Sequence, residues 1–406
     1  MASVVAPSQS LRRARWAVGV LFFVNGAFYA NWVPRIPDAK VALGLDAGML
    51  GLALLGGGVG ALVGSLIAGP LDIRYGSREV STLAGLALAV LLVGPGSAWS
   101  WLTLTVALWL FAACDAVMDV AMNAHAVAVQ RGYGRSIVNG FHALWSIGAV
   151  AGSLVGSVAA ARGVGMVAHL ALAGLTLGSA VLIAHRWLLP TAEVRGPSAT
   201  GTRDEGGIRR SERARRLGLV PPTGAVGALG LMALLGGLVE DAPGSWSAVY
   251  LREALSASPG MAGLAYATFV GAMTVGRLLG DGAVERFGAV RVLRTGAMVG
   301  AAGLATGLLL ATPAAAIIGF GLVGIGVSTL FPLVFATAGT LADTPSGGAI
   351  GMVSLIARAG FLFGPGLIGG IADVVGLSAA LGVVVSACAG IAATAGVVAR
   401  RAERGV

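Results

Sequence analysis

The sequence predicts an all-α membrane protein whose twelve transmembrane helices form two pseudo-symmetric six-helix bundles. Three observations carry this prediction. The composition is too apolar for a water-soluble fold, apolar runs of membrane-spanning length recur along the whole chain, and the second half repeats the first.

The first observation is the composition. Of 406 residues, 56% are hydrophobic and only 11% are charged, whereas a soluble domain carries about 25% charged residues. A water-soluble fold would expose far too much apolar surface, so the surroundings must be largely lipid. In lipid, only helices and closed barrels satisfy their backbone hydrogen bonds, and barrel strands alternate apolar and polar residues. Segments such as 83–93 and 301–310 are apolar on nearly every side, which predicts helices.

The second observation is the succession of apolar runs. A helix needs about 20 mainly apolar residues to cross a membrane. Runs of this kind predict spans at 15–36, 47–70, 80–97, 100–128, 136–160, 164–188, 222–250, 260–281, 290–311, 313–340, 347–370 and 377–399. The polar stretch after the sixth run predicts an N-terminal bundle at 1–189, a cytoplasmic linker at 190–217 and a C-terminal bundle at 218–406.

The basic residues predict the orientation, because cytoplasmic loops are enriched in arginine and lysine. With both termini in the cytoplasm, 21 of the 27 basic residues fall in cytoplasmic segments and only 4 in outer loops. We therefore expect a multi-pass protein of the bacterial cytoplasmic membrane with both termini cytoplasmic. This topology also accounts for the net charge of +9 without any binding of nucleic acid.

The third observation is an internal repeat at an offset of 212 residues. The pattern Gly-Met-x-Gly-Leu-Ala occurs at 48–53 and again at 260–265, and Arg-x-Gly occurs at 74–76 and 286–288. Since each half holds an even number of spans, the two copies have the same orientation. Parallel repeats of this kind, with a site between them near the bilayer midplane, are typical of transporters.

With this layout, the chain resembles the major facilitator superfamily over its whole length. The family usually shows Gly-x-x-x-Asp-Arg-x-Gly-x-Arg between its second and third helices, and residues 69–78 read Gly-Pro-Leu-Asp-Ile-Arg-Tyr-Gly-Ser-Arg. A second copy lies at 281–288. The resemblance implies that arginines there pair with acids and helix C-termini when the cytoplasmic side closes. The residues expected to gate are Asp72, Arg74, Gly76, Arg78, Arg277, Asp281, Glu285 and Arg286.

Three further segments, 31–38, 139–146 and 246–251, are similar to the YbjJ/MosC-like branch of this superfamily. That branch implies transport of small polar, sugar-like solutes, a few members being linked to inositol-derived rhizopines. The Gly-Pro pair associated with efflux in helix five is absent there, so drug antiport is not inferred from it.

Acidic side chains inside the predicted spans are candidates for proton coupling, since ionisable groups at bilayer depth are costly and usually functional. Asp115, Asp119 and Asn123 share one helical stripe at i, i+4 and i+8. Two like charges on that stripe repel, which favours uptake of a proton by one of them. Glu240 and Asp241 are further candidates. The alternatives are structural hydrogen bonds for the first pair and a solvated helix end for the second.

Other polar side chains are candidates for binding the solute. Arg358 lies in the middle of its span and needs an acid, water or the solute as a partner. Asp115 and Asp119 are possible acidic partners. Arg277, in contrast, is expected to pair with Asp281, four residues further along the same helix. Amides, hydroxyls and aromatic rings suit a polyol or sugar, although the aromatic rings could instead anchor the helices at the membrane interface. The expected solute contacts are Asn25, Tyr29, Trp32, Asn123, His142, Trp145 and Arg358.

The function that these features predict is secondary active transport of a small polar solute by alternating access, coupled to protons. The alternatives are a proton-driven efflux pump for a metabolite or drug, and a channel or receptor. The sequence contains no Walker loop and no His-Glu-x-x-His motif, and its two cysteines show no metal or disulfide spacing. We therefore expect no enzyme activity, cofactor or metal, and a monomer in the lipid bilayer.

Overall fold

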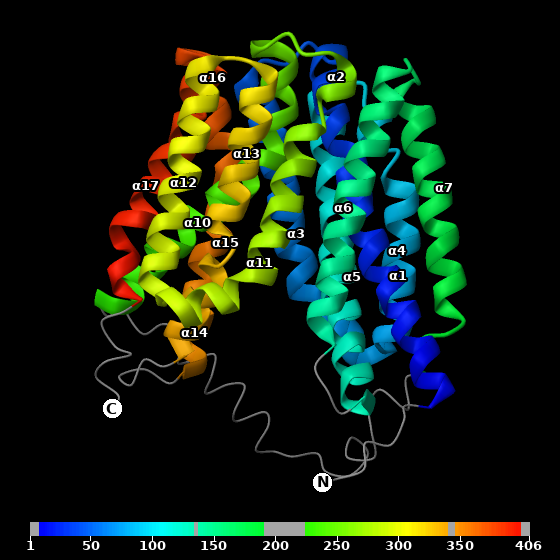
Figure 1. Ribbon diagram of the computed structural model, residues 1–406. Coiled ribbons are helices and arrows are strands. Elements are labelled where there is room, and N and C mark those ends of the chain that lie inside the picture. Colours follow the sequence, from blue (N-terminus) through cyan, green and yellow to red (C-terminus); the bar gives the residue numbers. More distant parts are fainter. Residues whose placement is uncertain (1–7, 134–136, 191–223, 340–345, 399–406) are drawn as a thin grey trace, which may run out of the picture. The chain divides into compact units, whose positions relative to one another are not determined.

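The computed structural model describes residues 8–133, 137–190, 224–339 and 346–398. Within these ranges, twelve helical segments are long and apolar enough to cross a membrane (Figure 1), which confirms the predicted number of spans. They cover Gln9–Ala42, Ala47–Tyr75, Ser77–Ser97, Trp101–Tyr133, Val138–Ala161, Met166–His185, Gly224–Ala254, Pro259–Phe287, Ala289–Leu310, Pro313–Gly339, Gly351–Val375 and Leu377–Val397.

Contacts along the chain define two compact units. Unit 1 comprises Met1–Thr200 together with Ser258–Ala267, and unit 2 comprises Gly201–Ala257 together with Thr268–Val406. The inclusion of Ser258–Ala267 in unit 1 was not foreseen from the sequence. Apart from Pro190, the predicted linker 190–217 lies outside the described residues, and the sequence-based boundaries stay a prediction.

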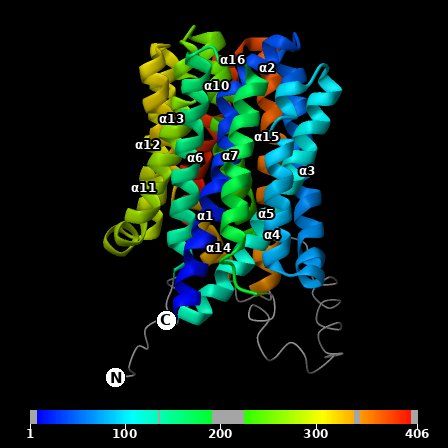
Figure 2. The same ribbon diagram turned by 90° about the vertical axis from the view of Figure 1, so that its right-hand side faces the viewer.

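Unit 1 is a bundle of apolar helices. Its helices are α1 (Gln9–Trp32), α2 (Ile36–Ala42), α3 (Ala47–Tyr75), α4 (Ser77–Leu91), α5 (Trp101–Tyr133), α6 (Val138–Ala161) and α7 (Met166–His185). The main packing partners are α1 with α6, α3 with α5, and α4 with both α5 and α7. Figure 2 shows α1 lying beside α6 and α7. The side chain of Asp46 caps α3 by accepting a hydrogen bond from the Met49 amide at 2.6 Å.

Unit 2 repeats this plan with irregularities. Its helices are α10 (Gly224–Val249), α11 (Leu264–Phe287, which enters this unit at Thr268), α12 (Ala289–Leu310), α13 (Pro313–Val327), α14 (Leu330–Gly339), α15 (Ser346–Val375), α16 (Leu377–Ala380) and α17 (Gly382–Thr394). Helix α10 continues into a π-helical turn at Tyr250–Ala254. Here α10 packs on α15, and α12 packs on α13 and α17.

The internal repeat extends to the backbone. Gly76 between α3 and α4 has φ 91° and ψ 149°, and Gly288 between α11 and α12 has φ 83° and ψ 145°. This region of conformational space is essentially restricted to glycine, which explains why glycine stands at both positions. The preceding arginines also behave alike, because Arg74 lies over the ring of Tyr75 and Arg286 over the ring of Phe287.

The tenth span departs from the prediction of one continuous helix at 313–340. It is broken at Ser328–Thr329, between α13 and α14. Pro332, four residues after Ser328, has no backbone N–H to donate to the Ser328 carbonyl. The corresponding span in unit 1, α5, holds no proline and runs without a break.

Candidate functional site

The polar centre of unit 1 is a chain of three hydrogen-bonded side chains from three helices. Asn25 on α1 donates from Nδ2 to Oδ1 of Asp115 on α5, at 2.8 Å. Trp145 on α6 donates from Nε1 to Oδ1 of the same asparagine, at 2.9 Å. The sequence predicted Asp115 for proton coupling and Asn25 and Trp145 for solute binding, and the structure joins the three by hydrogen bonds.

Close packing of α1 on α6 holds this chain in place. A Cβ atom added to Gly26 would collide with the backbone carbonyl of Trp145, and one added to Gly148 would collide with that of Phe23. Small residues thus let the two helices approach until their backbones touch, as is common between membrane helices. Asn25 itself is buried, so its amide orientation is set by the two partners.

The other two polar residues of the α5 stripe form a separate pair. Asn123 donates to Oδ1 of Asp119 at 3.0 Å and to the Asp119 backbone carbonyl at 2.9 Å. The side chain of Asp119 is exposed. The two carboxylates predicted as one pair therefore differ: Asp115 is tied to a neighbouring helix, and Asp119 is paired along its own helix.

The remaining predicted solute contacts of unit 1 lie along α1 and α6. The ring of Tyr29 meets the ring of Tyr266 edge-on, with centroids 6.1 Å apart, and His142 meets Phe22 edge-on at 5.2 Å. Trp32 is only 1% exposed, which excludes the alternative role of a membrane-interface anchor for this ring. Within the described part of the chain its indole N–H has no hydrogen-bond partner, so a role in solute binding stays a prediction.

In unit 2, the two adjacent acids of α10 have different partners, that of Glu240 on α11 and that of Asp241 on α10 itself. Arg277 Nη2 on α11 lies 3.6 Å from Oε1 of Glu240, and Ser245 donates to Oδ2 of Asp241 at 2.9 Å. The expected pairing of Arg277 with Asp281 is therefore wrong. Among the described residues, the ion pair of Arg277 is with Glu240, because the side chain extends across the helix interface instead of along its own helix.

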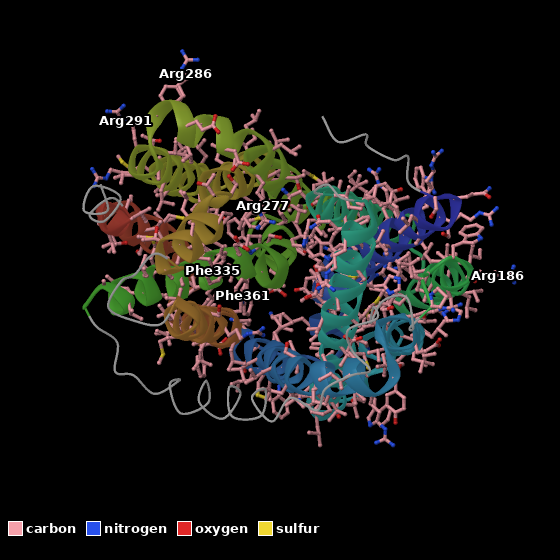
Figure 3. All side chains as sticks on the ribbon, turned by 90° about the horizontal axis from the view of Figure 1, so that it is seen from below. Arg186, Arg277, Arg286, Arg291, Phe335 and Phe361 are labelled. Carbon is pink, nitrogen blue, oxygen red and sulfur yellow. The ribbon has the colours of Figure 1, made fainter. Side chains whose placement is uncertain are left out.

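An aromatic cluster in unit 2 was not predicted from the sequence. The ring of Phe331 on α14 stacks on Phe335 at 5.7 Å and on Phe361 of α15 at 6.0 Å. Phe335 and Phe361 are labelled in Figure 3. The glycines at 236 and 237 of α10 leave room for these rings. Arg358 lies on α15 one turn before Phe361, with an exposed side chain. Its pairing with the acids of unit 1 stays a prediction.

The predicted gating motif is anchored by histidines that belong to no motif in the sequence. Ser77 is hydrogen-bonded to Nδ1 of His125 at 3.0 Å, and Nε2 of this histidine accepts from the Leu189 amide at 3.1 Å. Arg78 donates to the backbone carbonyl of His185 at 3.2 Å, as expected for an arginine at a helix C-terminus. No spacing signal in the sequence links these positions, because they meet only through helix packing.

A second unpredicted contact joins α6 to the segment before α11. Ser153 donates to the carbonyl of Gly263 at 2.8 Å, and the Gly263 amide donates to Oγ of Ser157 at 3.0 Å. A Cβ atom at this glycine would collide with both hydroxyl groups. This contact explains why Ser258–Ala267 groups with unit 1.

The comparisons with known proteins agree with this architecture. The chain is 36% identical over 385 residues to an uncharacterized MFS-type transporter of Yersinia pestis, covering 93% of this chain and 94% of that protein. The chain belongs to the major facilitator superfamily. It is also 30% identical over 381 residues to the membrane protein MosC of Rhizobium meliloti, covering 92% of this chain and 89% of MosC, which confirms the predicted likeness to MosC. No family model matches the chain.

Solved structures show the same fold. The nucleoside transporter NupG matches with a TM-score of 0.74 at 12% identity, covering 95% of this chain and 99% of that one. A D-xylose–proton symporter matches with a TM-score of 0.74 at 11% identity, covering 96% and 97%. Because a relative named as an MFS-type transporter is 36% identical over 93% of the chain, and twelve segments can span a membrane, this major facilitator protein is a multi-pass membrane transporter and not an enzyme. No group of His, Cys, Asp and Glu that could hold a metal ion occurs within the described ranges.

Proposed function

We propose that the protein is a proton-coupled carrier that moves a small polar solute across the cytoplasmic membrane by alternating access. The observation that carries the proposal is the hydrogen-bonded chain of Asp115, Asn25 and Trp145, at 2.8 and 2.9 Å. It joins a group that can take up a proton to a ring that can contact a solute. A change in the hydrogen bond between Asn25 and Asp115 is therefore expected to change the bond between Asn25 and Trp145.

The proton is expected on Asp115. A charged carboxylate at bilayer depth costs about 2.5–3.5 kcal/mol on insertion scales, and proton binding removes that charge. Among the described residues, Asn25 is the hydrogen-bond partner of this carboxyl group. An amide donor binds a carboxylate more strongly than a carboxylic acid, so protonation weakens this bond. The amide of Asn25, and with it the indole of Trp145, then gains freedom to move.

The solute that suits this surface is hydroxylated. An amide, a phenol and an indole lie along α1 and α6 as Asn25, Tyr29 and Trp145. Such groups hydrogen-bond the edges of a polyol or sugar and stack on its apolar face. Relatives at 30–36% identity are named only as transporters or as a membrane protein, so the solute class rests on this chemistry.

Alternating access is supported by the repeat. The two halves share the Gly76 and Gly288 turns and the same arginine stacking, and like-oriented repeats suit rocking about a central site. The distribution of arginine favours a cytoplasmic position for both termini. We expect the monomer to be the transporting form.

The test is proton-driven solute accumulation in proteoliposomes, with a panel of sugars and inositols as solutes. Replacing Asp115 with Asn should abolish accumulation driven by a pH gradient while sparing energy-independent exchange. Asp119→Asn separates the two carboxylates, and we expect a smaller loss because its partner Asn123 lies on the same helix. Asp46→Asn is the matched control, since asparagine caps a helix as well as aspartate does. Full pH-driven accumulation by the Asp115→Asn, Asp119→Asn double variant would refute proton coupling at α5.

A further inference from the structure

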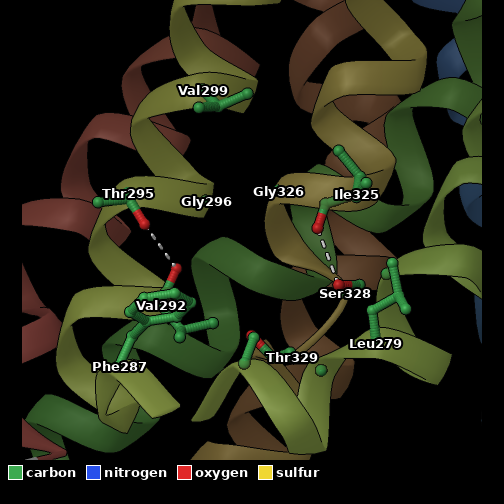
Figure 4. Close-up of a pocket in the computed structure, with 13 residues that line it drawn as sticks. Leu279, Phe287, Val292, Thr295, Gly296, Val299, Ile325, Gly326, Ser328 and Thr329 are labelled. Carbon is green, nitrogen blue, oxygen red and sulfur yellow. Dashed lines mark hydrogen bonds between the residues drawn. The ribbon is translucent and has the colours of Figure 1, made fainter.

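Unit 2 carries an apolar groove between α11, α12 and the end of α13, separate from the polar residues described above. Its volume is about 340 Å³, which lies within the range of about 300–1,000 Å³ for small-molecule sites. The walls include Leu279 and Phe287 of α11 and Val299 of α12 (Figure 4). These three side chains are 64%, 50% and 46% exposed, so large apolar groups face outward here.

Two of the three hydroxyl groups that line the groove, those of Thr295 and Ser328, are hydrogen-bonded within the protein. Thr295 donates to the carbonyl of Val292 at 3.3 Å, and Ser328 donates to the carbonyl of Ile325 at 2.8 Å (Figure 4). Such bonds to the preceding turn leave mainly methyl and methylene groups toward the groove. The walls therefore suit a hydrocarbon chain and not a polar solute.

The length of the groove matches one leaflet of a bilayer. Along α11 the lining runs from Gly276 to Phe287, which is a rise of about 16 Å at 1.5 Å per residue. Half of the hydrocarbon core of a bilayer is about 15 Å thick. An acyl chain could thus lie in the groove over its full depth, with its headgroup beside the Gly288 turn.

Two arginines stand at that turn. The guanidinium of Arg286 lies 5.4 Å from the ring centre of Phe287, which lines the groove, and Arg291 immediately precedes Val292 of the lining. Both are exposed, and Figure 3 shows both extending outward from unit 2.

The acids of the same helix point elsewhere. Around α11, at 100° per residue, Asp281 lies about 140° and Glu285 about 180° from Gly276, which lines the groove. The end of the groove therefore presents positive charge, while the negative charges of the helix face away from it.

We propose that this groove binds an anionic phospholipid, with an acyl chain against Leu279 and Val299 and its phosphate between Arg286 and Arg291. Basic residues at a membrane surface favour anionic lipids by about fivefold per charge. Two arginines acting together should favour an anionic over a zwitterionic headgroup by about 25-fold.

Native mass spectrometry of the purified full chain tests the proposal. The probes are phosphatidylglycerol and phosphatidylcholine with identical acyl chains, added at equal concentration. The wild type should retain phosphatidylglycerol about 25-fold more strongly, and the Arg286→Gln, Arg291→Gln double variant should lose that preference. Ala283→Phe, which fills the groove, should lower the binding of both lipids. Arg131→Gln, an exposed arginine at the end of α5, is the matched control and should leave the preference unchanged.

Each contrary result would overturn the assignment. Equal retention of the two lipids by the wild type, or an undiminished preference in the double arginine variant, excludes headgroup recognition at this turn. An equal loss in Arg131→Gln indicates general surface charge in place of a site. Displacement of phosphatidylglycerol by inorganic phosphate at the same concentration identifies a phosphate site and not a lipid site. Because lipid binding is measured directly, these outcomes do not depend on transport.

Discussion

Replacing Gly148 with alanine should destabilise unit 1, whereas the same replacement at Gly140 of the same helix should not. An added Cβ atom at Gly148 would lie 2.8 Å from the carbonyl carbon of Phe23 and closer still to its oxygen. Ordinary carbon contacts begin at about 3.5 Å, so α1 would have to move by at least about 0.7 Å to relieve the contact with the carbonyl carbon alone. No atom lies within 4 Å of the corresponding position at Gly140.

The comparison isolates the packing cost. Alanine favours a helix over glycine by about 1 kcal/mol, and both variants share this gain. Overpacking at a close contact costs about 1–3 kcal/mol, and only Gly148→Ala bears it. The free energies of unfolding of the two variants should therefore differ by about 1–3 kcal/mol, with Gly140→Ala at or above the wild type.

Thermal unfolding in detergent, followed with a thiol-reactive dye, measures this difference. In a Cys388→Ala background the remaining cysteine is Cys114, which lies on α5 of unit 1, so the dye reports on the bundle that is perturbed. Movement of α1 should also lengthen the 2.9 Å bond between Trp145 and Asn25 and reduce transport. If Gly148→Ala unfolds at or above the temperature of Gly140→Ala, the backbone contact between α1 and α6 is not as described.

Two further predictions concern contacts that cross between helices. His125→Ala should lower the midpoint temperature of thermal unfolding, because it removes the hydrogen-bond partner of the Ser77 hydroxyl and of the Leu189 amide. Each group left unsatisfied should cost about 1–3 kcal/mol. An unchanged midpoint temperature would contradict these two hydrogen bonds. A double-mutant cycle on Glu240→Gln and Arg277→Gln should give a coupling at or below about 1 kcal/mol, since the arginine side chain is 42% exposed and the N–O distance is 3.6 Å; a coupling well above this value would show that the pair is more enclosed.

The sequence by itself determined the number of spans, their approximate limits and the repeat. These features depend on local composition, because every span must be apolar over its own length whatever its neighbours are. Lipid raises the cost of every polar group in a span, and for this reason Asp115, Asn25 and Trp145 stand out as candidates in the sequence alone. The glycines at 76 and 288 in the repeated motif could likewise be recognised from the sequence, because a positive φ at these turns favours glycine.

Only the tertiary structure decided which polar groups meet. Asn25 binds a carboxylate that lies 90 residues away in the sequence, and Arg277 pairs with Glu240 instead of the nearer Asp281. The spacing of residues in the sequence likewise did not predict the partners of His125 or the stacking of the phenylalanines on α14 and α15. The physical reason is that a partner is set by how each helix is rotated and how closely it packs. Glycine contacts distributed over the whole bundle determine both quantities.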